Sequence, residues 1–175
     1  MNNRSKELLF NISSLNCNSL VKTHDTQKQS NFIRYLRSLN FNIMAFQETH
    51  TTTDHENFIN VQFQASQSLW TRHCGLLSFS SKYQLSDNLI PSNPRIILSK
   101  ISHPQNFYAP FHVLVVYAPA STGKDRREFF DSVLDALNSV SDIDPHRIII
   151  LGDFNYSYHR RNLSTQTSLK WGYHI

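Results

Sequence analysis

The sequence predicts an α/β fold, because a strand–helix–strand pattern occurs twice along its 175 residues. In the first unit, a strand ends at Asn16, a helix follows, and a second strand leads to Glu48. In the second unit, a strand ends at Tyr117, a helix follows, and a last strand ends at Asp153. Each unit has the length of a crossover connection, which makes its two strands parallel. Open sheets of such strands form the basis of α/β proteins.

The bulk composition fits one folded domain over residues 1–175. The hydrophobic fraction is 39%, and twelve Phe and seven Tyr supply large apolar surfaces for a core. A formal net charge of +4 suits a polyanionic partner such as DNA. No apolar run approaches the ~20 residues that span a bilayer, and the start lacks a secretory signal. We therefore expect an intracellular protein, nuclear or cytoplasmic, with no membrane association and no protein partner indicated.

The first half of the chain begins with an apolar segment at residues 8–15, which is short enough for a strand. Apolar residues then recur at helical spacing over residues 26–39 and predict a helix with one buried stripe. The clearest later strands are residues 43–46, 75–79 and 95–98. Asp54 is expected to cap the start of a helix.

The second half of the chain has a cleaner pattern. Residues 111–117 are rich in β-branched and aromatic side chains and predict a strand. Residues 125–140 predict a helix with one apolar face, which Asp125 is expected to cap. Residues 147–151 form a short apolar strand, as is typical when both faces of a sheet are covered. That strand leads directly into the turn Gly-Asp-Phe-Asn at residues 152–155.

Polar residues follow the predicted parallel strands where each strand ends. These are Asn16, Glu48, Tyr117 and Asp153. Parallel strands have their carboxyl ends at one edge of a sheet, and open sheets bind ligands at that edge. The four side chains are therefore expected to converge on one cleft although they are far apart in sequence.

The residue types at this cleft suit phosphodiester chemistry. Mg²⁺ prefers oxygen ligands and takes one or two carboxylates besides water and phosphate oxygens, so Glu48 is a candidate ligand. Asp153 is placed to orient or deprotonate a water, and Asn155 to hydrogen-bond a phosphate oxygen or the nucleophile. Tyr117 is placed to donate to a non-bridging oxygen as charge builds. The simpler alternatives are a surface Glu, ordinary Gly-Asp turn chemistry and a buried Tyr.

Four motifs in order carry a resemblance to a known family. They are Leu-Asn-Cys-Asn-Ser-Leu at residues 15–20, Gln-Glu-Thr-His at 47–50, Val-Tyr-Ala-Pro at 116–119 and Leu-Gly-Asp-Phe-Asn at 151–155. Together they resemble the endonuclease/exonuclease/phosphatase superfamily, the DNase-like fold. The amino-acid sequences of the second and third motifs are most similar to those of the endonuclease domain of LINE-type retroelements. The resemblance extends from about residue 8 to residue 160.

The resemblance implies a four-layer α/β sandwich, in which two mixed sheets lie face to face with helices outside. It implies hydrolysis of phosphodiesters that depends on Mg²⁺, with Mn²⁺ as the alternative ion, and DNA as partner. By position, Asn16 and Glu48 would lie at the metal and Tyr117 would contact the phosphate. Asp153 would activate the water, with Asn155 supporting it.

Two departures from the family pattern stand out. Ser19 occupies a position that is usually glycine, which affects the tightness of the first turn. The family's final segment normally supplies an Asp and then an Asp-His pair, but only twenty residues follow Asn155. Neither His159 nor His174 follows an aspartate, and the Asp54-His55 pair lies too early in the chain. The expectation is a family domain that is incomplete at its C-terminus, in which this loss puts activity in question.

Three functions remain open from the sequence. The first is a Mg²⁺-dependent DNA endonuclease of retroelement type. The second keeps the fold and acts as a phosphatase or phosphodiesterase on lipid, inositol or nucleotide substrates, because one fold serves several substrates. The third is a non-catalytic retroelement remnant. Whether the chain is an enzyme is left open among them.

Overall fold

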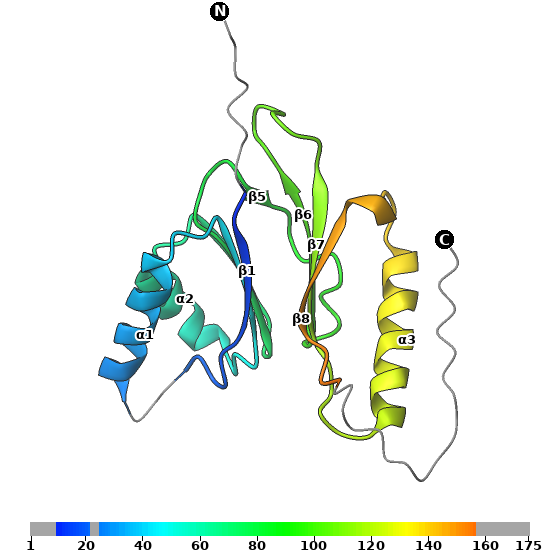
Figure 1. The fold of residues 1–175 in the computed structure, drawn as a ribbon, viewed down its shortest axis with the longest axis horizontal. Coiled ribbons are helices and arrows are strands. Elements are labelled where there is room, and N and C mark those ends of the chain that lie inside the picture. Colours follow the sequence, from blue (N-terminus) through cyan, green and yellow to red (C-terminus); the bar gives the residue numbers. More distant parts are fainter. Residues whose placement is uncertain (1–9, 22–24, 157–175) are drawn as a thin grey trace, which may run out of the picture.

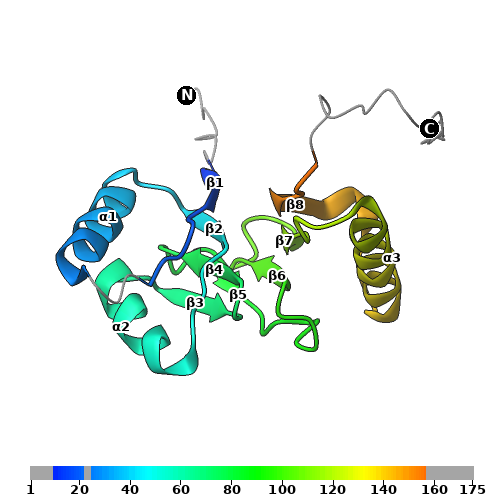
Figure 2. The ribbon, with the colours of Figure 1, turned by 90° about the horizontal axis from the view of Figure 1, so that it is seen from below.

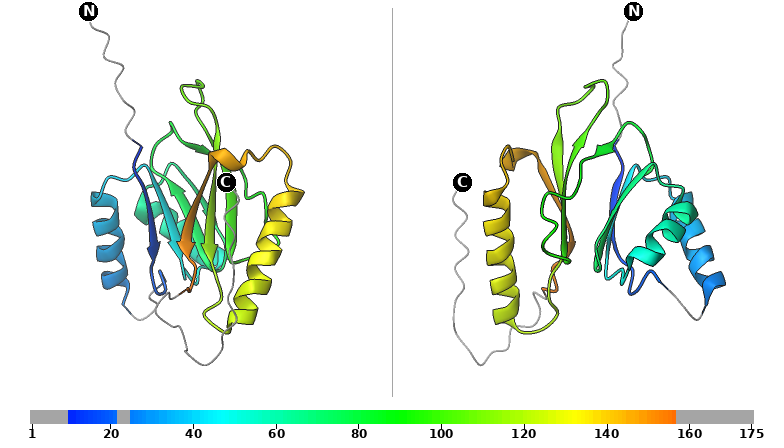
Figure 3. Two further views of the ribbon diagram at one scale, coloured as in Figure 1. Left: turned by 45° about the vertical axis from the view of Figure 1, so that its right-hand side comes forward. Right: turned by 180° about the vertical axis from the view of Figure 1, so that it is seen from behind.

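The computed structural model describes residues 10–21 and 25–156 and forms four layers (Figures 1 and 3). Two four-stranded mixed sheets lie face to face, helices α1 and α2 cover the outer face of one sheet, and α3 covers the other. The expected four-layer sandwich is therefore confirmed. The expectations for the tail, including His159 and His174, lie outside the described residues.

The first sheet contains the first predicted strand–helix–strand unit. Its strands, in spatial order, are β1 (Ile12–Asn16), β2 (Ile43–Gln47), β4 (Cys74–Ser78) and β3 (Gln67–Trp70). Strands β1 and β2 are parallel, with Asn16 beside Gln47, and α1 (Thr26–Ser38) connects them. Helix α2 (Thr53–Phe63) follows β2 on the same outer face. The parallel pairing predicted from the crossover length is thus present.

The second sheet contains the second predicted unit. Its strands, in spatial order, are β5 (Gln84–Leu85), β6 (Ile96–Ser102), β7 (Phe111–Tyr117) and β8 (Ile148–Asp153). Strands β7 and β8 are parallel, with Tyr117 beside Asp153. Helix α3 (Gly123–Ser139) and a 3-10 turn, η1 (Pro145–Arg147), connect them. Among the described helices, none is long and apolar enough to cross a membrane.

Three apolar clusters hold the layers together. Side chains that alternate along the strands fill the space between the sheets, among them Ile43, Ala45, Val113 and Val115. The opposite faces pack on the helices, Phe46 against Phe63 of α2 and Val116 beside Val133 of α3. This alternation is the period of two that a strand imposes, and it sends residues of one strand to two different clusters. Burying one side chain such as Phe46 contributes roughly 1.5–3 kcal/mol.

The predicted helix caps are wrong by two or three residues. The N-cap of α3 is Thr122, whose hydroxyl accepts from the Asp125 N–H, while the Asp125 carboxylate accepts from the Thr122 N–H. Asp125 is thus the third residue of a capping box, where its acidic side chain is still favourable. Helix α2 begins at Thr53 after the N-cap Thr52, so Asp54 lies within the first turn.

Strand β8 is less covered than its apolar sequence predicts. Ile150 is 49% exposed, whereas residues of β7 beside it are buried. In the described part of the chain, β8 pairs only with β7 and therefore forms the edge of its sheet. The expectation that both of its faces are covered is wrong at Ile150, although Ile148 on the same face packs against the cluster beneath α3.

Candidate functional site

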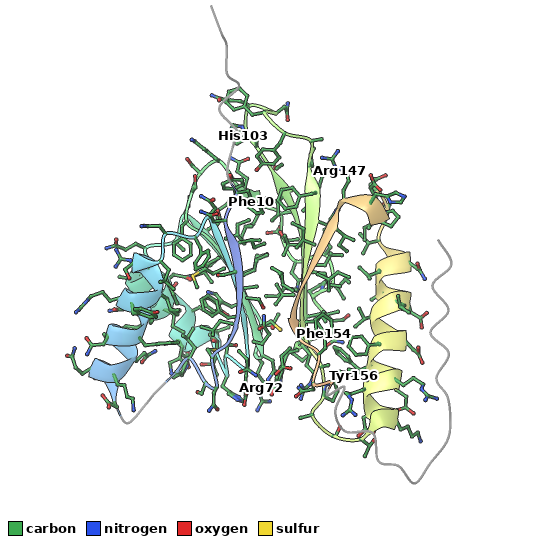
Figure 4. The ribbon with its side chains drawn as sticks, viewed as in Figure 1. Phe10, Arg72, His103, Arg147, Phe154 and Tyr156 are labelled. Carbon is green, nitrogen blue, oxygen red and sulfur yellow. The ribbon has the colours of Figure 1, made fainter. Side chains whose placement is uncertain are left out.

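The ends of β1, β2, β7 and β8 meet at one end of the sandwich, which Figure 2 views directly. In Figure 4, Arg72 and Phe154 lie at this end, and Phe10 and His103 lie at the opposite one. The predicted site residues therefore converge, but across two facing sheets instead of along one sheet edge. Strands β1 and β2 contribute one side, and β7 and β8 contribute the other.

Asp153 is held by hydrogen bonds to both of its carboxylate oxygens. The Asn16 side chain donates from Nδ2 to Asp153 Oδ2 at 2.7 Å, and the Asn155 backbone N–H donates to Asp153 Oδ1 at 2.9 Å. The other amide atom of Asn16, Oδ1, accepts from the backbone N–H of Asn18 at 3.1 Å. Both donors fix the direction of the carboxylate and leave each oxygen with a lone pair for a further donor.

The turn after β8 is tied to the end of β7. The Asn155 Nδ2 donates to the Ala118 carbonyl at 2.6 Å, and Asn155 has a left-handed φ of 47°. Asn155 therefore positions this turn with its amide nitrogen, and its Oδ1 remains the atom that can face a ligand. Gly152 has φ of 154°, and a Cβ there would lie 2.0 Å from the Val116 carbonyl oxygen. Only glycine fits this close strand contact.

Glu48 lies immediately after β2 in a left-handed conformation, with φ of 57°. Its carbonyl accepts from the Ser19 N–H at 2.8 Å, which links it to the first turn. Within the described residues, the nearest basic group to its carboxylate is His50, with Nε2 3.9 Å from Oε1, and no Lys or Arg pairs with it. A strained backbone that presents an acidic side chain without a Lys or Arg partner is a common feature of functional sites.

The Tyr117 ring has a cationic neighbour, Arg95, and an aromatic neighbour, His73. The Arg95 guanidinium carbon is 4.9 Å from the centre of the phenol ring, and the His73 ring centre is 5.8 Å away. Burial raises the pKa of Tyr117 above its ordinary value, and the negative charges of Glu48 and Asp153 raise the pKa further. Both carboxylates therefore lie within electrostatic reach of the phenol, which stays protonated and able to donate.

His73 and Arg95 are two site residues that the sequence patterns did not identify. Each directly precedes a strand, β4 after His73 and β6 with Ile96 after Arg95. Strand β4 is antiparallel to β2, and β6 is antiparallel to β7, so the starts of β4 and β6 lie beside the carboxyl ends of their partners. Finding these two residues requires knowing that β4 and β6 pair antiparallel with β2 and β7.

The donor set fits a hard divalent cation. Glu48 supplies carboxylate oxygens, and Asn16 supplies an amide oxygen. Throughout residues 10–21 and 25–156, no group of three or more His, Cys, Asp or Glu side chains could hold a metal. Mg²⁺ does not require such a group, because it keeps several waters and binds through one or two carboxylates. The absence of an ion pair from Lys or Arg to Glu48 is consistent with a cation being held there.

A separate cavity of about 280 Å³ opens beside α1 and α2. It is lined by Leu36, Arg37, Asn40, Phe41, Phe63, Gln64 and Phe79. Phe41 precedes β2 and Phe79 follows β4, so this cavity lies at the end of the sheet opposite Glu48. Because no carboxylate lines it, it offers no group for the chemistry suggested at the site.

A family model matches most of the chain. The model described as the Endonuclease/Exonuclease/phosphatase family covers residues 13–171. A transposon TX1 uncharacterized 149 kDa protein from Xenopus laevis is 29% identical over 164 residues, which are 89% of this chain. The match spans only 12% of the length of that protein.

Solved structures share the fold at low sequence identity. Humanized D. rerio TDP2 has a TM-score of 0.60 and 13% identity, over 85% of this chain and 63% of that one. D. rerio TDP2 complexed with a single strand DNA product has a TM-score of 0.56 and 11% identity, over 85% of this chain and 61% of that one. At such identities the likeness shows the fold alone.

Proposed function

The chain belongs to the endonuclease/exonuclease/phosphatase family, and we propose that it is a Mg²⁺-dependent phosphodiester hydrolase that cuts DNA. The observation that carries this proposal is the pairing of Asn16 with Asp153 beside Glu48 and Tyr117. It brings a candidate metal ligand, a base and a neutral hydrogen-bond donor to one end of the sandwich.

Glu48 and Asn16 are the residues that would hold Mg²⁺, or Mn²⁺ in its place. When bound, the ion offsets negative charge on the phosphate and polarises its oxygen. The Glu48 carboxylate is suited to this because no Lys or Arg in the described residues neutralises it. The Asn16 amide contributes its oxygen while its nitrogen holds Asp153 in place.

Asp153 orients the attacking water and accepts its proton as the water oxygen bonds to phosphorus; the P–O bond to the leaving strand breaks, and the leaving oxygen takes a proton from solvent water. Its carboxylate already receives two hydrogen bonds, from Asn16 and Asn155, so it does not have to reorient during the reaction. Tyr117 donates its hydroxyl proton in a hydrogen bond to a non-bridging oxygen, where negative charge builds in the transition state. Asn155 supports the reaction by fixing the turn and by offering its amide oxygen to the water.

DNA is the substrate that the observations favour. The relative in Xenopus laevis is a transposon protein, and D. rerio TDP2 is a neighbour in fold with a DNA product bound. The net charge of +4 is also suited to a polyanion. We further propose an intracellular location, as DNA cleavage for transposition requires.

The decisive experiment is the nicking of supercoiled plasmid by the purified chain. We expect nicked circles with Mg²⁺ and none with EDTA. Glu48→Gln and Asp153→Asn should each lower the rate by at least ~10²-fold. Glu56→Gln on α2 and Asp131→Asn on α3 are the matched controls, because they make the same chemical changes away from the site.

The alternative functions correspond to other outcomes. Mg²⁺-dependent hydrolysis of small diesters or inositol phosphates without nicking would assign a different substrate. A folded wild type that hydrolyses none of these substrates would identify a non-catalytic remnant and overturn the proposal. Nicking that survives both Glu48→Gln and Asp153→Asn would remove the assignment of the site.

A further inference from the structure

His73 is held firmly at the site by its backbone. Its carbonyl accepts from the Thr49 N–H at 3.2 Å, and its N–H donates to the Pro94 carbonyl at 3.3 Å. The imidazole ring lies against two other rings, with centroid distances of 5.8 Å to Tyr117 and 5.8 Å to His50. The position of the side chain therefore follows from strand pairing and packing together.

The His73 side chain makes no hydrogen bond within the described residues. Its Nδ1 is buried and lacks a partner. Buried N–H groups without a partner are rarer than buried acceptors without one, so we assign no hydrogen to Nδ1. The hydrogen of a neutral imidazole then resides on Nε2. Burial and the charge of Arg95 lower the pKa of His73, which keeps the ring neutral.

Packing alone does not account for a histidine at this position. A phenylalanine would keep both ring contacts and would leave no buried nitrogen without a partner, which is the costly feature of the present arrangement. Nδ1 is buried and cannot reach a ligand, whereas Nε2 is not fully buried and has no hydrogen-bond partner within the described residues. Nε2 is therefore the ring atom that can contact a ligand at the Tyr117 end of the site.

We propose that His73 binds the substrate, with its Nε2–H donating to an oxygen of the phosphate that Tyr117 contacts. This inference rests on the proposed function and names one more residue that touches the DNA backbone. Arg95 lies over the Tyr117 ring and donates to the Tyr117 carbonyl at 3.3 Å, so its charge lies beside the same phosphate. The phosphate oxygens would then accept hydrogen bonds from the Tyr117 phenol and the His73 imidazole, and the positive charge of Arg95 would attract them.

Two substitutions at position 73 separate the donor from the ring. His73→Phe keeps an aromatic ring against Tyr117 but has no donor, and His73→Gln keeps a donor at the reach of Nε2 but has no ring. His112→Phe is the matched control, because burial lowers the pKa of His112 as it does that of His73, but His112 lies at the far end of β7. Melting temperatures of all three variants identify any that fail to fold.

The probe is a short fluorescent DNA duplex, and its binding is measured by anisotropy in EDTA, where cleavage is suppressed. We expect His73→Phe to weaken binding roughly fivefold, since one neutral hydrogen bond contributes about 1 kcal/mol. His73→Gln should bind close to wild type, and so should His112→Phe. A duplex carrying the methylphosphonate stereoisomer in which the methyl group replaces the contacted oxygen should bind wild type and His73→Phe equally.

Two results would overturn the inference. The first is wild-type affinity in folded His73→Phe, and the second is equal loss in His73→Phe and His73→Gln, which would assign His73 to packing. Absence of any DNA binding by the wild type would overturn it as well. If binding responds as expected but plasmid is not nicked with Mg²⁺, the proposed catalytic function fails and the contact from His73 stands.

Discussion

The Asn16 side chain on β1 and the Asp153 carboxylate on β8 are joined by a hydrogen bond of 2.7 Å that crosses from one sheet to the other. The two residues are 137 positions apart in the sequence. Each belongs to a different strand–helix–strand unit, so this bond links the two halves of the fold at the candidate site. Its formation requires that both units have folded and that the two sheets have docked.

Asn16→Asp should place two carboxylates in direct contact and destabilise the protein. Because like charges at this distance repel, we expect the free energy of unfolding at pH 8 to fall by about 1–3 kcal/mol. Mg²⁺ should recover part of this loss and raise the melting temperature of Asn16→Asp more than that of the wild type. Asn18→Asp, which adds the same charge two residues away, is the control. Equal melting of the two variants, with and without Mg²⁺, would contradict a metal site at Asn16.

Tyr117→Phe should slow DNA nicking without unfolding the protein. This variant lacks the hydroxyl of Tyr117 but keeps the aromatic ring and its contacts with Arg95 and His73. We expect a decrease of ~10²-fold in the nicking rate, as for other single donors to a developing charge. Because the pKa of Tyr117 is raised, its donor form persists above the ordinary tyrosine value, and wild-type activity should not decline from this group below pH 10. A decline near pH 8 that Tyr117→Phe abolishes would refute this assignment.

The site could be predicted from the sequence to the extent that strand ends define it. Asn16, Glu48, Tyr117 and Asp153 each follow an apolar run, and the crossover lengths made their strands parallel in pairs. The family resemblance implied two facing sheets, but only the structure shows that the two pairs belong to different sheets. They also missed His73, because its neighbours give no sign of the antiparallel partner that brings it to the site.

The sequence predicted only the start of helix α2, because its apolar residues do not define a single face. Its two buried residues, Ile59 and Phe63, are four apart and define the packed face. Phe58 and Val61 are 44% and 72% exposed, however, so apolar residues occur around the helix and obscure that face. The position of the sheet, and not the helix sequence, decides which of these side chains become buried.

Ser19→Gly should stabilise the first turn. Ser19 has φ of 68°, a conformation that costs non-glycine residues roughly 1–2 kcal/mol. The serine hydroxyl offsets part of this by donating to the Val21 carbonyl at 2.8 Å. We expect a net gain of about 0.5–1 kcal/mol in the free energy of unfolding, measured in urea. Ser19→Ala, which loses the hydroxyl but keeps the strained φ, should be less stable than the wild type; a gain in both variants would mean that strain is not the cause.

Stability should fall at alkaline pH because of Tyr108. Burial raises the pKa of Tyr108 to about 12, with a further increase from Tyr83, whose ring is 5.7 Å away. An unfolded tyrosine loses its proton near pH 10, so this contribution to stability is complete below pH 10 and disappears as pH rises to about 12. The wild type should therefore lose melting temperature over this range more steeply than Tyr108→Phe. Tyr35→Phe, at an exposed phenol on α1, is the control and should follow the wild type.

Ile150 should tolerate a charge that its neighbour Ile149 does not. Ile149 packs into the cluster between the sheets, whereas Ile150 faces away from it and is 49% exposed on the edge strand β8. Ile150→Lys should change the free energy of unfolding by less than about 1 kcal/mol and reduce aggregation in light scattering, because charges on edge strands oppose pairing between molecules. Ile149→Lys should destabilise by roughly 3 kcal/mol or more, since it buries an unpaired charge. Equal damage from both substitutions would show that something covers Ile150 in solution, and the apolar face of β8 would then be an interface.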